Sequence, residues 1–308
     1  MKIIYHTDLD GHCAAAISLR WARLERRAGN KDCTAVELIP MNYGWDFPWG
    51  RFEAGELVHM VDFSLPEEDM ERLVGLVGAE KLVWLDHHAT QIKMEQGNEV
   101  LKALRGARVD GTAGCELTWA YLFGTKVPEA VRRLGRFDVW DFADEPEIMT
   151  FKYGMESVPN EPAEEIWDEV IPFPAKAGDP KTVAHPEDIA RRMANILEAG
   201  CHVQYYVEEQ NRIKAAGMAF EAVLQGHGVI AQNSGGNSAA LEPVFNPDRH
   251  AFMVLFWLNK RGIWDVRLYG TPSSKLHLGE LAKYLSYDGK GGGHVGAAGY
   301  QTDVRPFK

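Results

Sequence analysis

Apolar residues in the first half of the chain form short runs that alternate with longer segments of helical periodicity. Four runs predict β-strands, over residues 1–5, 34–40, 55–64 and 81–88. Helices are expected over 13–27, 66–77, 113–123 and 128–137. Strands that alternate with helices favour right-handed crossovers and a parallel sheet covered on both faces. The first half is therefore predicted to be an α/β domain.

The second half has a different pattern. Residues 144–186 are rich in Pro and Glu with weak periodicity, so they are expected to form an insertion or lid with a short helix. A long helical run follows over 188–220 and then come shorter elements, which are strands over 228–233, 251–259 and 262–270, a helix over 278–285 and a glycine-rich loop over 287–300. The fold class is predicted to be α/β throughout, with domains over 1–185 and 223–308 joined by a helical linker over 186–222.

The composition indicates the class of protein and its cellular compartment. The chain has 308 residues, of which 45% are hydrophobic and 25% charged, as in ordinary folded proteins. No apolar run approaches the roughly 18 residues that cross a bilayer, and the N-terminus has no signal-peptide pattern. The four cysteines are far apart, which argues against a disulfide framework and a thiolate zinc site. We expect a cytoplasmic protein with buried thiols and no membrane partner.

The charge is unevenly distributed. The formal net charge of −11 divides into −14 for residues 1–222 and +3 for residues 223–308. An acidic protein is a poor candidate for coating long nucleic acid through a basic surface. This balance favours short substrates over duplex DNA.

Acidic and histidine residues follow three of the predicted strands. They are His6, Asp8 and Asp10 after the first strand, Asp62 after the third, and Asp86, His87 and His88 after the fourth. Because ligands bind outside the carboxyl ends of parallel strands, these side chains are expected to converge. A single aspartate in such a place is usually a helix N-cap or a solvated loop residue. Three segments together are poorly explained in that way, because clustered carboxylates without a cation repel one another.

The types of ligand indicate which metal ions the site would bind and which reaction they would support. Carboxylates with imidazoles favour manganese or a similar first-row cation over calcium or structural zinc. Two cations about 3.5–4 Å apart, bridged by one aspartate, would activate water and stabilise both oxygens of a phosphoryl displacement. The sequence therefore predicts a phosphohydrolase with two divalent cations, with Mn²⁺ preferred and Mg²⁺ or Co²⁺ as alternatives.

The segments that carry these residues resemble a known family. "HTDLDG", "VDFS", "WLDHH" and "GRFDVWDF" are similar to the successive motifs of the DHH phosphoesterase superfamily. "WDVRLYG" and "GKGGGHVGAAGY" resemble the DHH-associated substrate-binding domain of its nucleic-acid branch. The superfamily includes RecJ-type exonucleases, nanoRNases that also act on adenosine bisphosphate, cyclic-dinucleotide phosphodiesterases and family II pyrophosphatases. The resemblance implies a DHH domain, a helical linker and a smaller substrate-binding domain, with a cleft between the two domains.

The resemblance also implies a role for each matching residue. His6 and Asp8 would hold the first metal, Asp10 and His87 the second, and Asp62 would bridge them. The fourth motif would supply one more aspartate, for which Asp138 is favoured and Asp141 is a competitor. His88 would face the scissile phosphate, and Asp86 would orient an imidazole through a hydrogen bond.

The substrate side rests on a second set of residues. Gly291, Gly292 and Gly293 would expose backbone N–H groups to an anion, although a flexible turn is an alternative. With His294 and Arg267, they resemble the family's clamp for a terminal phosphate or base. An arginine fork suits phosphate, and a surface ion pair is its alternative role.

The tryptophans in apolar runs are expected to be buried in the core, although a stacking platform for bases stays open. They are Trp84, Trp119, Trp140, Trp257 and Trp264.

The leading hypothesis is a manganese-dependent phosphoesterase that hydrolyses short single-stranded oligonucleotides or small nucleotides, in the manner of an oligoribonuclease or a bisphosphate nucleotide phosphatase. The alternatives are a cyclic or linear dinucleotide phosphodiesterase, an inorganic pyrophosphatase and a non-catalytic nucleotide or RNA sensor. The substrate identity, the strand polarity and a homodimer are left open.

Overall fold

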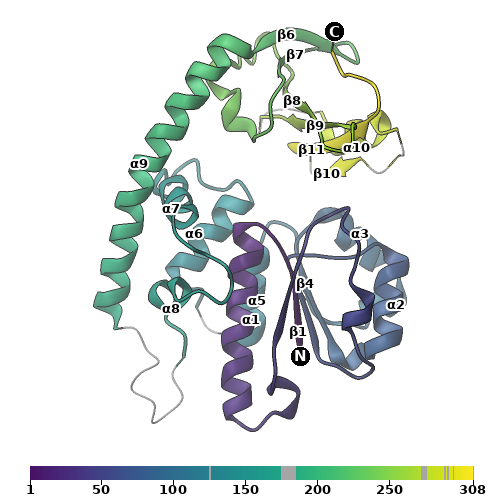
Figure 1. The fold of residues 1–308 in the computed structure, drawn as a ribbon, viewed down its shortest axis with the longest axis vertical. Coiled ribbons are helices and arrows are strands. Elements are labelled where there is room, and N and C mark those ends of the chain that lie inside the picture. Colours follow the sequence, from purple (N-terminus) through teal and green to yellow (C-terminus); the bar gives the residue numbers. More distant parts are fainter. Residues whose placement is uncertain are drawn as a thin grey trace. The chain divides into compact units, whose positions relative to one another are not determined.

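The computed structural model describes residues 1–124, 126–174, 185–271, 276–287, 289, 291–293 and 295–307 (Figure 1). The chain forms two compact units, Met1–Gln204 and Tyr205–Lys308. The division between them falls within one long helix, α9 (Pro186–Met218).

The first unit is built on a five-stranded sheet. Its strands are β1 (Lys2–His6), β2 (Glu37–Met41), β3 (Val58–Val61), β4 (Leu82–Asp86) and β5 (Arg105–Arg108). They run in the order β2-β1-β3-β4-β5, and every pair is parallel, which confirms the predicted parallel sheet. The edge strand β5 was not predicted because its sequence RGAR contains no apolar run. The strand order reverses at β1, and such a switch point opens a crevice at the carboxyl ends of the strands.

Helices cover both faces of this sheet (Figure 1). On one face lie α1 (Leu9–Arg27), α5 (Gly114–Phe123) and α6 (Glu129–Asp138), and on the other lie α2 (Glu67–Val77) and α4 (Glu99–Lys102), with α3 (Ala89–Gly97) beside them. Neighbouring residues of β1 point to opposite faces, so Ile3 and Tyr5 enter one core and Ile4 the other. The two cores hold the strand ends in fixed positions. Single 3₁₀ turns lie at Lys31–Cys33, Trp49–Arg51 and Ala79–Lys81.

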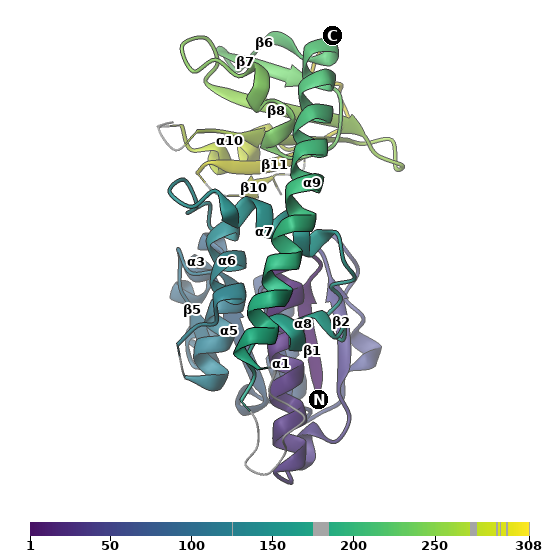
Figure 2. The ribbon, with the colours of Figure 1, turned by 90° about the vertical axis from the view of Figure 1, so that its left-hand side faces the viewer.

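Residues 144–174 of the segment that was expected to be an insertion or lid belong to the core instead, and residues 175–184 of it lie outside the described residues. The segment contains two helices, α7 (Glu147–Glu156) and α8 (Ile166–Val170), whose Phe151 and Trp167 are fully buried. The first half of α9 lies beside α7 and α8 (Figure 2). A Cβ at Gly154 of α7 would lie 2.1 Å from the carbonyl oxygen of Ile196, so glycine allows the two helices to approach closely. The weak periodicity of the sequence concealed this packing.

The second unit contains a mixed six-stranded sheet. Its strands are β6 (Phe220–Leu224), β7 (His227–Gln232), β8 (Phe252–Leu258), β9 (Trp264–Tyr269), β10 (Gly292–Gly293) and β11 (Ala297–Thr302), in the order β10-β11-β9-β8-β7-β6. Among the described strands of this sheet, only β7 and β8 pair in parallel. Helix α10 (Leu278–Leu285) covers one face, and 3₁₀ turns lie at Ser238–Ala240 and Glu242–Val244. Strands β6, β10 and β11 were not predicted, and the glycine-rich segment forms a hairpin in place of the expected loop. Among the described residues, no helix is both long and apolar enough to span a membrane.

Candidate metal centre

The turn from β1 into α1 positions the first group of ligands. Asp8 is the N-cap of α1, since its Oδ1 accepts a hydrogen bond from the backbone N–H of Gly11 at 2.9 Å. Its Oδ2 lies 2.5 Å from Nδ1 of His6, the last residue of β1. A Cβ at position 11 would lie 2.1 Å from the carbonyl oxygen of His6, so only glycine fits this turn. The cap makes α1 begin at Leu9, four residues before the predicted start.

Asp10 is held by the beginning of another helix. Its Oδ2 accepts a hydrogen bond from the N–H of Gly114 at 2.7 Å, and its Oδ1 accepts one from Cys115 at 3.0 Å. These residues open α5, where N–H groups and the helix dipole favour a negative charge. A Cβ at Gly114 would lie 2.6 Å from Cβ of Asp62. The sequence interpretation missed this glycine, and its only signal was a small-residue pair, Ala113–Gly114, ahead of an apolar run.

Asp62 is the most constrained residue of the group. It follows β3 with a φ of +52°, in the left-handed region that non-glycine residues rarely adopt, and its side chain is 1% exposed. Neither carboxylate oxygen has a hydrogen-bond partner among the described residues. Burial, together with the charges of Asp10 and Asp8, raises the pKa of Asp62 well above its usual range. Backbone strain and an orphaned buried carboxylate occur together at functional sites.

The segment after β4 fixes two histidines. Oδ1 of the fully buried Asp86 accepts hydrogen bonds from the backbone N–H groups of His87 at 2.7 Å and His88 at 3.1 Å, and it lies 2.7 Å from Nδ1 of His88. Burial alone would raise the pKa of Asp86, but its hydrogen bonds and proximity to His88 outweigh burial and lower it. Burial likewise opposes the charged form of His88, yet the Asp86 carboxylate raises the pKa of that imidazole. Asp86 therefore orients His88 and favours its charged form.

The strand ends bring these side chains together. Nε2 of His87 lies 3.2 Å from Oδ1 of Asp62, 3.2 Å from Oδ2 of Asp138 and 4.0 Å from Oδ2 of Asp10. Nδ1 of His6 lies 3.9 Å from Oδ2 of Asp62. Three groups have all of their ligand atoms within 4.8 Å of one another, namely His6/Asp8/Asp62, Asp10/His87/Asp138 and Asp62/His87/His88. Burial is the largest influence on His87 and lowers its pKa, which favours the neutral imidazole that a metal requires.

The two aspartates of the fourth segment lie in different places. Asp138 ends α6 and faces His87, and burial together with the charge of Asp10 raises its pKa. The side chain of Asp141 is 72% exposed and lies 3.3 Å from Nε of Arg136. The structure therefore brings Asp138, and not Asp141, into the cluster.

The donor set fits divalent cations. Carboxylate oxygens that lack hydrogen-bond donors, placed among imidazole nitrogens, are the groups that a bound cation satisfies. Oxygen with nitrogen ligands and no thiolate suits a first-row ion such as manganese. Asp62 takes part in two of the groups above.

Two of the residues proposed for substrate binding, Arg267 and Gly292, lie on one face of the second unit's sheet. Arg267 of β9 is opposite Gly299 of β11, which is opposite Gly292 of β10, and directly opposed residues share a face. The two glycines leave this row bare beside the exposed Arg267, whose guanidinium lies 5.9 Å from the ring centre of Trp257. The expectation of a loop is wrong for Gly292 and Gly293, because they pair with β11.

Two other proposed substrate-binding residues, Gly291 and His294, are not part of this row. Gly291 precedes β10, and a Cβ there would lie 2.3 Å from the carbonyl oxygen of Ala282, so the position requires glycine for packing. His294 lies outside the described residues.

The tryptophans divide between core and surface. Trp84 and Trp119 are buried as expected, with 0% and 2% exposure. Trp140, two residues after Asp138, is 53% exposed with a φ of +59°, and it packs on Phe142 at a ring-centre distance of 5.6 Å. The expectation of a core role is wrong for Trp140, because the left-handed turn that ends α6 directs this side chain outward.

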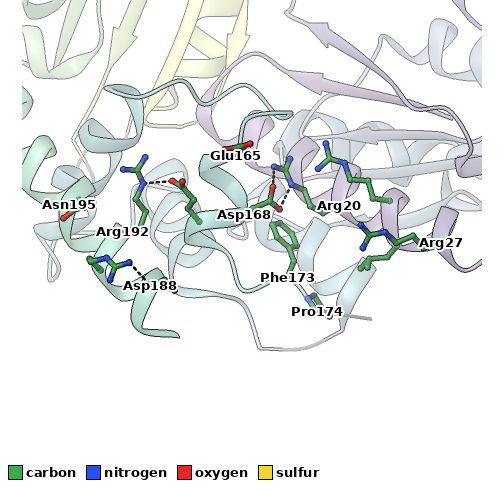
Figure 3. Close-up of a pocket in the computed structure, with 13 residues that line it drawn as sticks. Arg20, Arg27, Glu165, Asp168, Phe173, Pro174, Asp188, Arg192 and Asn195 are labelled. Atoms are coloured by element: carbon green, nitrogen blue, oxygen red, sulfur yellow. Dashed lines mark hydrogen bonds and ion pairs between the residues drawn. The ribbon is translucent and has the colours of Figure 1, made fainter. Parts of the chain in front are cut away.

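A cavity of about 590 Å³ lies away from these residues, among α1, α8 and the beginning of α9 (Figure 3). Ion pairs connect its walls, as between Arg20 and Asp168 at 2.7 Å and between Arg192 and Glu169 at 2.7 Å. None of the proposed metal ligands or substrate-binding residues lines it. These ion pairs join α8 and α9 to their neighbours, so we interpret the polar walls of the cavity as part of the packing of α8 and α9 on α1.

Comparisons with known proteins give the fold. No protein-family model matches the sequence, and no curated protein matches it. A solved DHH domain, from a protein described as a member of a family of ribosomal proteins, is 15% identical with a TM-score of 0.58, and the alignment covers 97% of this chain and 81% of that chain.

Two more distant solved structures align over nearly all of this chain. A pGpG-specific phosphodiesterase from Vibrio cholerae is 12% identical with a TM-score of 0.46, and the alignment covers 98% of this chain and 93% of that chain. The exonuclease RecJ bound to manganese is 14% identical with a TM-score of 0.44, and the alignment covers 98% of this chain and 85% of that chain. At such identities a likeness concerns the fold alone. The chain, with its parallel sheet in the order β2-β1-β3-β4-β5, has a fold similar to that of the solved DHH domain.

Proposed function

We propose that this protein is a metal-dependent phosphoesterase that acts on short single-stranded oligonucleotides or small nucleotides. The observation that carries the proposal is Asp62, a buried and strained carboxylate without hydrogen-bond donors among the described residues, at the meeting point of two groups of ligands. Such a carboxyl group destabilises the fold in either form, because it is charged and unpaired or neutral with buried oxygens that lack partners. A cation site accounts for it.

Each ligand has an assigned place in this proposal. His6, Asp8 and Asp62 would hold one cation, and Asp10, His87 and Asp138 would hold another next to Asp62. Bound divalent cations supply a Lewis acid and a water molecule activated at neutral pH. Mn²⁺ is the preferred ion on the ligand types, with Mg²⁺ and Co²⁺ as alternatives.

The chain's own residues provide the remaining functions. His88, held by Asp86 and favoured in its charged form, donates a hydrogen bond to a phosphate oxygen and offsets negative charge as the ester is cleaved. In the second unit, Arg267 grips a terminal phosphate with its planar fork, and the bare row of Gly299 and Gly292 lets the substrate approach the strands. The small positive charge of residues 223–308 suits a short anion.

A screen of substrates tests the proposal. The purified protein is incubated with diribonucleotides, short RNA and DNA, adenosine bisphosphate, cyclic dinucleotides and pyrophosphate, each with Mn²⁺, Mg²⁺ or Co²⁺. We expect metal-stimulated hydrolysis of a nucleotide ester and none of pyrophosphate. Asp62→Ala should lower turnover by orders of magnitude, whereas Asp141→Ala, the same change at an exposed acid, should retain it.

The other candidate functions give different results in the same screen. A cyclic or linear dinucleotide phosphodiesterase would act on those substrates alone, and a pyrophosphatase would release phosphate from pyrophosphate. A non-catalytic sensor would bind nucleotides without any turnover that Asp62→Ala removes. Absence of metal-stimulated hydrolysis across the whole panel would contradict the proposal.

A further inference from the structure

A short turn after β2 is anchored to the candidate metal centre. The N–H of Trp45 donates to the carbonyl oxygen of Asn42 at 3.1 Å, and Gly44 has a φ of +82°, as in a type II turn with Tyr43 at its second position. The side chain of Asn42 accepts a hydrogen bond from the N–H of Tyr43 at 2.8 Å and donates one to Oγ1 of Thr7 at 3.0 Å. Thr7 lies between His6 and Asp8, so the turn is fixed to the loop that carries two ligands.

The ring of Tyr43 forms part of the wall of this centre. Its centre lies 5.2 Å from that of Phe63 at an interplanar angle of 35°, 5.6 Å from that of His6, and 6.0 Å from that of His88 with an edge-on geometry. The residue is nevertheless 47% exposed. Contact with Phe63 explains the packed part of the ring. It does not explain why a rigid aromatic side chain is presented to solvent directly beside a ligand and the proposed phosphate-binding histidine.

We propose that Tyr43 is the platform on which a nucleobase stacks when the phosphate attached to that nucleotide is bound by the metal ligands and His88. The inference rests on the proposed function and names its substrate class, which is a phosphate ester that carries a base. Stacking uses the π-face that every base has, so Tyr43 favours nucleotides over other phosphate esters without selecting one base. The anchored turn lowers the entropy lost on binding, because the ring is already held in place.

A binding cycle with matched ligands tests this role. Affinity is measured by calorimetry in the presence of Mn²⁺ for a phosphorothioate-linked diadenosine, which resists hydrolysis, and for analogues in which either base is replaced by hydrogen. Removing the stacked base should weaken binding to the wild type by about 5- to 100-fold, the range that corresponds to one base–aromatic stack. In Tyr43→Leu, which still covers Phe63, removal of that base should change affinity less than about twofold.

Two variants complete the design. Tyr43→Phe keeps the ring and should retain the wild-type preference for the base. Trp45→Leu removes an aromatic residue that is 56% exposed in the same turn and that has no ring contact with His6 or His88 among the described residues, and it should also retain the preference. Thermal denaturation of each variant checks that the fold is kept.

The outcomes separate this inference from the proposed function. An equal loss of affinity on base removal in the wild type and in Tyr43→Leu, or no binding of any dinucleotide by the wild type, would overturn the inference. Turnover is measured separately with the natural diadenosine. If the wild type shows base-dependent binding but no turnover of the substrate panel, the proposed hydrolysis fails while the role of Tyr43 stands.

Discussion

The two units of the chain treat charge in opposite ways. The first unit buries several acids and a histidine at one edge of its parallel sheet, and these are Asp10, Asp62, Asp86 and His87. The second unit leaves Arg267 exposed on a sheet face, and its described residues contain no group of three metal-ligating side chains. The buried acids of the first unit require a partner for their charges, whereas water can solvate the exposed guanidinium of Arg267.

Sheet geometry explains this difference. In the first unit, the carboxyl ends of parallel strands gather side chains from distant parts of the chain, and helices cover both faces and exclude water. In the second unit, largely antiparallel pairing leaves one row of residues accessible beside glycines that carry no side chains. Substitutions of the buried acids and histidine in the first unit should therefore change stability and turnover together. Substitution of Arg267 on the exposed row of the second unit should change substrate affinity alone.

The largest effect is expected at Asp62. Asp62→Asn should lower turnover by more than the roughly 10- to 100-fold typical of changes behind metal ligands. Without added metal the variant should be more stable than the wild type at neutral pH, because burial and the charges of Asp10 and Asp8 oppose the ionisation of the Asp62 carboxyl, and an amide does not ionise. With Mn²⁺ the order should reverse, since a cation stabilises only the protein that binds it.

Thermal denaturation with and without Mn²⁺ measures this reversal. Asp46→Asn, at an exposed position, is the control and should follow the wild type. If Mn²⁺ raised the melting temperatures of the wild type and Asp62→Asn equally, Asp62 would not be a ligand.

A smaller loss is expected when Asp86 is changed. Asp86→Asn keeps the shape of the side chain but removes the charge that orients His88, so turnover should fall by about 10- to 100-fold. Stability should fall as well, by about 1–3 kcal/mol, because a neutral amide oxygen accepts the two backbone hydrogen bonds more weakly than a carboxylate, and the new NH2 group replaces a buried oxygen that has no partner among the described residues. Steady-state kinetics and urea denaturation measure the two effects. A loss of turnover with unchanged stability would mean that the amide keeps both backbone contacts and that the carboxylate charge serves His88 alone.

The sequence predicted the parts of this centre that follow from strand ends. The apolar runs before His6, Asp62 and Asp86 located three strands, and the rule for parallel sheets predicted that their ends would meet. The choice between Asp138 and Asp141 was open, because both lie in the same short segment and only the packing of α6 on α5 directs one of them inward.

Other features had no local signal. Strand β5 is polar in sequence, and its place at the edge of the sheet depends on pairing with β4. The helices α7 and α8 lie in a segment whose composition resembles a loop, and their burial depends on contacts with α1 and α9. Tyr43 was missed because its proximity to His88 arises from the order of strands, with β2 beside β1, and not from spacing in the sequence.

Acid should destabilise the first unit through His59, a buried residue that is not a ligand. Its Nδ1 lies 2.7 Å from Oγ of Ser18, and burial lowers its pKa from 6.5 to about 3. In the folded state the imidazole stays neutral, whereas the unfolded chain takes up a proton below pH 6.5. The free energy of unfolding should therefore fall by up to about 1.4 kcal/mol per pH unit as the pH decreases from 6.5 towards 3.

His59→Gln, which cannot titrate, isolates this contribution. Urea denaturation between pH 4 and 7 should give a curve for the variant that is flatter than that of the wild type over the same range. The variant will be less stable at pH 7, because a flexible amide replaces a packed ring. Parallel pH dependences for the two proteins would show that His59 takes up its proton without unfolding.

The smallest effect on stability is expected when Arg267 is changed, and this substitution tests the role of the second unit. Arg267→Met should change the free energy of unfolding by less than about 0.5 kcal/mol, because the guanidinium is exposed and its contact with Trp257 spans 5.9 Å. If the guanidinium grips a substrate phosphate, KM should rise by about 10- to 100-fold with kcat little changed, since a charge-assisted hydrogen bond is worth about 1.5–3 kcal/mol. Arg249→Met removes another exposed arginine, paired with Glu221, and should leave KM unchanged. A fall in kcat with constant KM would place Arg267 in the reaction itself and remove the distinction between a unit that reacts and a unit that only binds.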